Sequence, residues 1–386
     1  MKRALTKKYD FGELKKEPID ESSIPKAIKG KMKYVGIELE KGSGNYVQID
    51  HSRIYQFVSE YLRSLGVIVT STTEAYEKFT WAKEYFWKAL RVNQDFYTSL
   101  THSYWRHGYF IYVPPNVKVT QPIQACFFVA SKGVAQPVHN VVIVDEGGEL
   151  NLVTGCATMS NEGLHVGVSE FYVKRKAKLT FTMIHGWAPE FEVRPRTSVI
   201  VEEGGTYVSY YVNLYPVSHL DMCPTTYLHK LAKGYMTSIL LGKKRSFMDI
   251  GSRIEFLGRD SRGEIVSRSI VRDQARVIMR GHLIGRAEKT RGHLECRSLL
   301  LSQRASVTTI PQLESYVEGS ELTHEAAIGR ISEDQLYYLM AKGFTEEEAV
   351  SLIVRGFIEV GLVHLPPQVR ASLRGVLRIV EKLARG

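Results

Sequence analysis

The feature that most constrains this sequence is a polar turn that returns at an almost constant spacing through the middle of the chain. Between these turns lie short segments of alternating apolar and polar residues, which are typical of strands. A sandwich does not need so regular a spacing, whereas a β-helix does, because each turn of its coil stacks on the one before. The spacing therefore predicts a mainly β protein with a parallel β-helix core. The turns lie about 28–29 residues apart, at 145–150, 174–179, 202–207, 230–235 and 258–263.

Helical periodicity flanks this repeat on both sides. Residues 52–65 and 73–90 carry apolar side chains at helical spacing. Residues 332–335 and 345–348 have the form of capping boxes, and a last helix is expected from Pro366. That last helix would carry a basic stripe of Arg370, Arg374, Arg378 and Lys382. The expected division is an N-terminal helical domain (1–107), a β-helix core (108–328) and a C-terminal helical domain (329–386).

Composition places the chain among globular proteins and argues against several function classes. Of the 386 residues, 44% are hydrophobic and 24% are charged, and no apolar run is long enough to span a bilayer. The first residues are basic but lack an apolar run behind them, so we expect no signal peptide, a cytoplasmic location and no membrane partner. The net charge of +10 is spread among acidic residues without a nucleic-acid-binding motif, so nucleic acid is not an expected partner.

The four cysteines, Cys126, Cys156, Cys223 and Cys296, stand far apart in the sequence. None has a second cysteine at the close spacing of a zinc site, and disulfides are not expected in the cytoplasm. On composition, each cysteine is interpreted first as a small buried hydrophobic residue.

The repeat gives two of these cysteines a histidine neighbour. Residues one period apart in a β-helix lie on adjacent strands, about 4.8 Å apart. Cys156 and His185 are one period apart, as are Cys296 and His324, and local alternation places each pair on one side of its sheet. A protonated imidazole beside a thiol would lower the thiol pKa and favour the thiolate. The alternative is a buried cysteine beside a core histidine that is hydrogen-bonded to a carbonyl.

Four stretches of the chain can be compared with known families: "GYFIYVPPNVKVTQPIQACF", "VVIVDEGGELNLVTGCAT", "LHVGVSEFYV" and "LTHEAAIGRISEDQLYYLMAKGFTEEEAVSLIVRGFIE". They resemble the SufB/SufD family, the scaffold subunits of the SUF iron–sulfur cluster assembly system. The C-terminal stretch is long and specific, and the resemblance runs from about residue 108 to 360.

This resemblance implies a right-handed parallel β-helix flanked by helical domains, in agreement with the period. It also implies a non-enzymatic scaffold that pairs with itself or a paralogue through the β-helix. A SufC-type ABC ATPase would dock on the C-terminal helices and hydrolyse ATP. A transient iron–sulfur cluster would form at the subunit interface, with a cysteine-desulfurase-type protein as sulfur donor.

Six residues receive roles from the resemblance. Cys156 matches the cysteine that accepts persulfide sulfur, with His185 and Trp187 nearby. Three residues match interface positions proposed as cluster ligands: Cys296, His324 and Glu325. Strict alternation along the strand, however, puts Glu325 on the opposite face from His324. A mixed set of thiolate, imidazole and carboxylate suits a scaffold, because it should release a cluster more easily than four cysteines.

The chain departs from the SufB pattern in its middle. His185 replaces a glutamine, and Phe128 and Ala130 replace an arginine and an asparagine of the segment that lines the proposed sulfur path. The stretch around Trp187, "IHGWAPEFEVRPRT", looks more like SufD. Two alternatives therefore stay open, a purely architectural SufD-like partner and a carbohydrate-active β-helix enzyme. The enzyme would need clustered Asp or Glu with Arg along one groove, a pattern that the sequence lacks.

Overall fold

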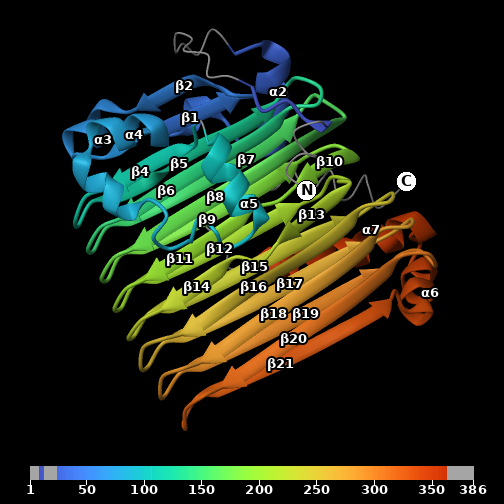
Figure 1. Ribbon diagram of the computed structural model, residues 1–386. Helices are drawn as coiled ribbons and strands as arrows, with labels where there is room; N and C mark the ends of the chain where they lie inside the picture. Colours follow the sequence, from blue (N-terminus) through green and yellow to red (C-terminus); the bar gives the residue numbers. More distant parts are fainter. Residues whose placement is uncertain (1–7, 13–23, 106, 363–386) are drawn as a thin grey trace.

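Most of the chain winds into a solenoid, whose strands form two long sheets on either side of one core (Figure 1). The computed structural model describes residues 8–12, 24–105 and 107–362. The coil makes about eight turns, and nearly all strand pairs are parallel, so the predicted parallel β-helix is confirmed. The first sheet contains β2 (Ser52–Val58), β1 (Gly44–Ile49), β5 (Lys118–Val129), β7 (Glu149–Thr158), β9 (Lys178–Gly186), β12 (Thr206–Asn213), β15 (Lys233–Gly242), β17 (Arg262–Val271), β19 (Arg291–Leu300) and β21 (Glu321–Arg330). The second contains β3 (Ile68–Ser71), β4 (Tyr109–Val113), β6 (Ala135–Val144), β8 (Glu162–Val173), β10 (Glu190–Val193), β11 (Arg196–Val201), β13 (His219–Met222), β14 (Thr225–Leu228), β16 (Phe247–Phe256), β18 (Arg276–Gly285) and β20 (Ser306–Ser315).

The repeating turns owe their shape to one residue in the left-handed backbone conformation. Gly147 and Gly204 fill this place with φ of 66° and 67°, and Lys176 does so with φ of 55°. Glycine accepts this conformation without the steric cost that a Cβ adds, about 1 kcal/mol. Since the turns have nearly equal length, the strands stay in register and their inward side chains stack into one continuous apolar core.

The N-terminal region is less helical than its pattern predicts. Residues 52–58 form strand β2, and only the short helix α3 (Glu60–Ser64) follows, so the helix predicted over 52–65 is wrong. Strand β2 pairs with β1 in antiparallel register and extends the first sheet. A short amphipathic segment fits a helix or a half-buried strand equally well, and here pairing with β1 decides. The other N-terminal helices are α2 (Lys26–Tyr34), α4 (Thr72–Lys78), α5 (Phe96–Tyr104) and the 3-10 helices η2 (Leu39–Lys41) and η3 (Thr80–Tyr85).

Helices α6 (Glu333–Ala341) and α7 (Glu346–Leu362) follow the last strand and lie beside the C-terminal turns (Figure 1). The capping box predicted at 345–348 is confirmed, because Thr345 and Glu348 exchange side-chain to backbone hydrogen bonds of 2.9 and 3.3 Å. The box predicted at 332–335 is wrong, since Ser332 occupies the N-cap of α6 without a side-chain hydrogen bond to the helix. The helix predicted from Pro366 lies outside the described residues, and the division into three domains stays a prediction.

A buried carboxylate fastens the segment between η3 and α5 to the outer face of the second sheet. Glu170 of β8 accepts hydrogen bonds from four consecutive backbone N–H groups, those of residues 87–90, at 2.5–3.1 Å. It is also bonded to His139 Nε2 at 2.8 Å and accepts the Tyr172 hydroxyl at 3.0 Å. The side chains of Glu170 and His139 are fully buried. Within the described ranges, no helix is long and apolar enough to cross a bilayer.

Candidate functional site

The two ends of the solenoid differ. Strands β1, β2 and β3 with helices α3 and α4 lie over the N-terminal end, whereas β20 and β21 end the coil at the other (Figure 1). Among the described strands, β21 pairs only with β19, and β20 only with β18. Leu313 and Ile328 align with inward-facing residues of the preceding turn but are 37% and 43% exposed. We call this last turn, β20 with β21, the open end.

The proposed cluster ligands lie at or next to the open end, but their register differs from the prediction. Cys296 aligns with Ala326, and His324 aligns with Leu294. The predicted stacking of Cys296 on His324 is therefore wrong by two residues. The cause is a period of 30 rather than 28 residues between β19 and β21, since Arg291 aligns with Glu321. His324 still shares the inner face with Cys296 and is exposed there.

Glu325 lies on the outer face of β21, as alternation predicts. Its Oε1 accepts a hydrogen bond from Arg297 Nη2 at 2.7 Å. Strand geometry thus separates Glu325 from His324. Across residues 8–12, 24–105 and 107–362, no three His, Cys, Asp or Glu side chains are grouped so that they could hold a metal ion. Burial raises the pKa of Cys296 to about 11, so its sulfur carries a proton at neutral pH in the single chain.

The second predicted pair, Cys156 with His185, is confirmed as an aligned pair on β7 and β9. Both side chains are buried inside the coil, and the Tyr211 hydroxyl lies 2.9 Å from His185 Nδ1. Burial raises the pKa of the Cys156 thiol well above its usual range and lowers the pKa of His185 well below its own. Both shifts oppose a thiolate beside an imidazolium in the single chain, and the sulfur-acceptor role of Cys156 stays a prediction.

Aromatic and polar side chains surround this pair. The Trp187 ring stacks on Phe191 and lies 5.0 and 5.5 Å from the rings of His165 and His185. In the described part of the chain, His185 Nε2 and Trp187 Nε1 are buried without a hydrogen-bond partner. The 3.0 Å bond between His165 Nδ1 and Gln136 Oε1 was not expected from the sequence, although the two residues align on β8 and β6 and the repeat spacing would have paired them.

A stack of hydroxyl groups runs inside the first sheet between the two cysteine sites. Cys296 aligns with Ser267, Ser267 with Ser238, and Ser238 with Tyr211, whose hydroxyl contacts His185. All four side chains are buried. The strands that carry these side chains lie about 4.8 Å apart. Phe128 and Ala130, which replace polar family residues, pack instead in the outer cluster beneath α2 and do not line this stack.

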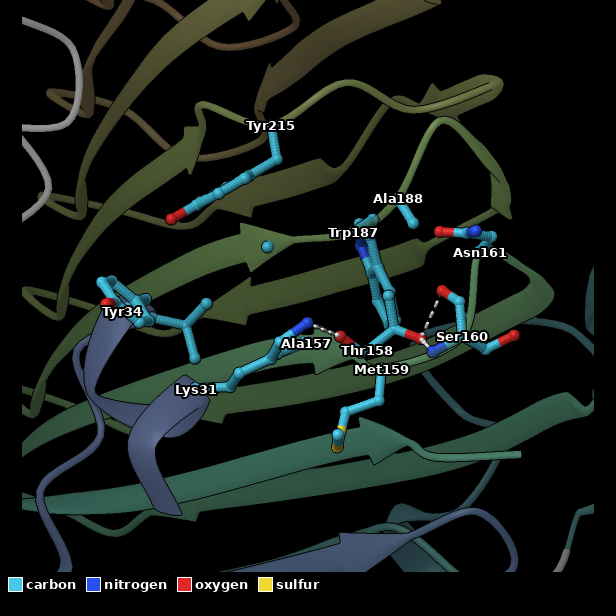
Figure 2. Close-up of a pocket in the computed structure, with 12 residues that line it drawn as sticks. Lys31, Tyr34, Ala157, Thr158, Met159, Ser160, Asn161, Trp187, Ala188 and Tyr215 are labelled. Carbon is cyan, nitrogen blue, oxygen red and sulfur yellow. Dashed lines mark hydrogen bonds between the residues drawn. The ribbon is translucent and has the colours of Figure 1, made fainter. Parts of the chain in front are cut away.

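A pocket of about 300 Å³ lies where α2 meets the ends of β7 and β9 (Figure 2). Tyr34, Trp187 and Tyr215 give it aromatic walls, while Ser160 and Asn161 add polar atoms. Lys31 Nζ donates to the Thr158 carbonyl at 2.9 Å across the pocket. Trp187 both lines this pocket and lies 5.5 Å, ring to ring, from His185 inside the coil.

The fold and these sites define a parallel β-solenoid protein with buried thiols and, among the residues that the structure describes, a last turn that no further strand covers. A family model for the "SUF system FeS cluster assembly, SufBD core domain" matches residues 127–357, and one for the "SufBD protein N-terminal region" matches residues 48–125. The chain therefore belongs to the SufBD family, which implies a role in iron–sulfur cluster assembly together with other SUF components.

Relatives from archaea and bacteria agree with this membership. The chain is 42% identical to an iron–sulfur cluster assembly SufBD family protein of Archaeoglobus fulgidus, over 92% of this chain and 95% of the relative. It is 40% identical to one of Methanothermobacter thermautotrophicus, over 92% and 88%. It is 31% identical to one of Staphylococcus epidermidis, over 92% and 78%.

Proposed function

We propose that this protein is a non-enzymatic, cytoplasmic scaffold on which an iron–sulfur cluster is assembled between two paired subunits. The observation that carries the proposal is the open end, which exposes apolar side chains and unpaired strand edges beside Cys296 and His324. Exposed edges and an uncovered core favour pairing with another chain. The second subunit is another copy or a paralogue.

Pairing of two subunits would also supply more cluster ligands than one chain offers. A cluster needs about four protein ligands. One chain offers a thiol and an imidazole on the inner face near the open end and a carboxylate, Glu325, on the outer face. A second subunit doubles this supply. Because iron binds the thiolate, coordination would release the Cys296 proton and offset its raised pKa.

Anaerobic reconstitution with iron and sulfide, in the presence of the ATPase, is expected to give a brown, labile chromophore. Cys296→Ala should lower its absorbance per subunit about fivefold or more, because a ligand is lost. Cys223→Ala is the matched control, since Cys223 is exposed and lies outside the open end. No chromophore in the wild type would contradict a cluster on this scaffold.

An unaffected Cys296→Ala protein would favour the architectural SufD-like function instead. That function has support in the structure, because the buried, protonated Cys156 is a poor nucleophile in the single chain. For Cys156 to accept sulfur from a cysteine-desulfurase-type donor, the surroundings that His185 and Trp187 form would have to open.

We propose further that a SufC-type ABC ATPase docks on α6 and α7. Helix α6 presents Tyr337 and Tyr338, which are 63% and 64% exposed, and Phe344 is exposed between the helices. Exposed aromatic side chains of this kind are enriched where proteins bind one another.

Changing both Tyr337 and Tyr338 to aspartate is expected to weaken ATPase binding about tenfold or more. The measurement is the dissociation constant between the two purified proteins. Tyr61→Asp, at an exposed tyrosine of α3, controls for the added charge and should bind normally. Undiminished binding by the double variant would refute docking on α6.

A further inference from the structure

Four charged side chains form a row on the outer face of the first sheet, from helix α7 to the open end. Arg268 belongs to β17, Glu295 and Arg297 to β19, and Glu325 to β21. We call these four residues the charge row. Three strands in succession contribute to it, and its last member is the proposed cluster ligand Glu325.

Each member of the charge row contacts the next. Arg268 Nη2 donates to Glu295 Oε1 at 2.8 Å, and Arg297 Nε lies 3.1 Å from the same oxygen. Arg297 Nη2 then donates to Glu325 Oε1 at 2.7 Å. Glu325 is thus hydrogen-bonded to Arg297, and Arg297 is ion-paired with Glu295.

The other end of the charge row is held by helix α7. Arg268 Nη1 donates to the Phe357 carbonyl at 3.3 Å, and the Phe357 ring lies 5.5 Å from the guanidinium carbon. Val354 and Ile358 of α7 are buried against the same sheet. A shift of α7 would therefore remove both contacts of Arg268 with Phe357.

Strand register makes the members of the charge row depend on one another. Arg268 aligns with Arg297, and Glu295 with Glu325, so like charges stand side by side. Such neighbours repel unless opposite charges lie between them. Solvent screens the inner half of the row little, since the side chains of Arg268 and Glu295 are only 7% and 16% exposed. A substitution of Arg268 should consequently change the position of the Glu325 carboxylate.

We propose that the charge row positions Glu325 according to the place of α7, so that a partner which moves α7 changes the carboxylate at the open end. This proposal rests on the proposed function, in which the ATPase docks on the C-terminal helices and Glu325 faces the cluster interface. Arg268, Glu295 and Arg297 are then positioning residues for Glu325.

Hydrogen exchange of the full chain, followed by mass spectrometry without any partner, tests the charge row by itself. Arg268→Gln is expected to speed exchange about threefold in β21 as well as in α7, although β19 lies between the strand of Arg268 and that of Glu325. Glu325→Gln should in turn speed exchange in α7, because coupling is reciprocal. When Arg268→Gln and Glu325→Gln are combined, the increase in exchange rate should be smaller than the sum of the two single increases.

Glu264→Gln is the matched control on the outer face of β17, since Glu264 has no ion-pair partner in the described part of the chain. Glu264→Gln should leave the exchange rates of α7 and β21 unchanged. Faster exchange in α7 alone after Arg268→Gln would overturn the proposal, as would strictly additive effects.

Reconstitution with iron and sulfide separates this proposal from the proposed function. If the wild type holds a cluster, a chelator should remove its iron about threefold faster from the Arg268→Gln protein than from the Glu264→Gln protein. Equal rates would overturn the proposal. A wild type without a cluster would refute the proposed function, while the exchange experiment would still decide whether the charge row couples α7 to β21.

Discussion

Replacing Glu170 by glutamine is expected to lower the free energy of unfolding by about 3–5 kcal/mol, because it disrupts a buried network of hydrogen bonds to an ionised carboxylate. The carboxylate accepts four backbone N–H groups as well as bonds to His139 and Tyr172. A glutamine would turn an NH₂ group toward these donors and leave several of them buried without a partner. Urea unfolding followed by tryptophan fluorescence measures the loss, and Trp87 and Trp105 report locally because both pack on His139.

The loss of unfolding free energy in the Glu170→Gln protein should be smaller at acidic pH than at neutral pH. Burial acts to raise the pKa of Glu170, but the bond to His139 and the backbone N–H groups outweigh it and hold the pKa below its ordinary value of 4.5. The ionised carboxylate therefore adds stability above about pH 4.5, and this stability is lost as the pH falls through the lower folded pKa. The difference between the wild type and Glu170→Gln should shrink in acid.

Glu162→Gln provides the control on the same strand, since its side chain is 47% exposed and lies 3.6 Å from Lys132. It should change the free energy of unfolding by less than about 0.5 kcal/mol. Equal stability of Glu170→Gln and the wild type would show that the segment at 87–90 does not depend on this carboxylate.

Replacing Leu313 and Ile328 together by aspartate is expected to weaken subunit pairing at least about 100-fold. Both side chains lie on the uncovered inner face of the open end, one on β20 and one on β21. Burying an unpaired carboxylate in an apolar contact costs several kcal/mol, and each 1.4 kcal/mol changes the dissociation constant about tenfold. Sedimentation velocity across a concentration series measures the constant.

Leu257→Asp controls for an added charge at an exposed leucine away from the open end, because Leu257 directly follows β16 and is 39% exposed. It should pair like the wild type. A wild type that stays monomeric in the presence of its paralogue, or a double variant that pairs normally, would contradict pairing through the open end.

The sequence predicted the solenoid because its turns repeat, and it predicted the alignment of Cys156 with His185 for the same reason. It failed between β19 and β21, where the period is 30 and shifts His324 two residues away from Cys296. A spacing estimate that averages over turns cannot detect such a local insertion. The resemblance to the SufB/SufD family was confirmed, whereas the roles of the six site residues stay predictions.

The local sequence pattern was also insufficient to predict the structure where contacts between distant parts of the chain determine it. Residues 52–58 carry a stripe that suits a helix, yet pairing with β1 makes them a strand. Nothing in the local sequence around Glu170 indicates that it accepts the N–H groups of residues about 80 positions away. The charge row is likewise invisible until the register brings three strands and α7 together.

By itself, the sequence determined the coil, since equal turn lengths force successive strands to stack in parallel. It also determined the family, since long stretches of side chains match. Only the tertiary structure shows that both thiols are buried, and this burial raises the pKa of Cys156 and of Cys296. The open end, too, is visible only in the tertiary structure. The sequence does not show whether another element packs over the inward-facing residues of the last turn.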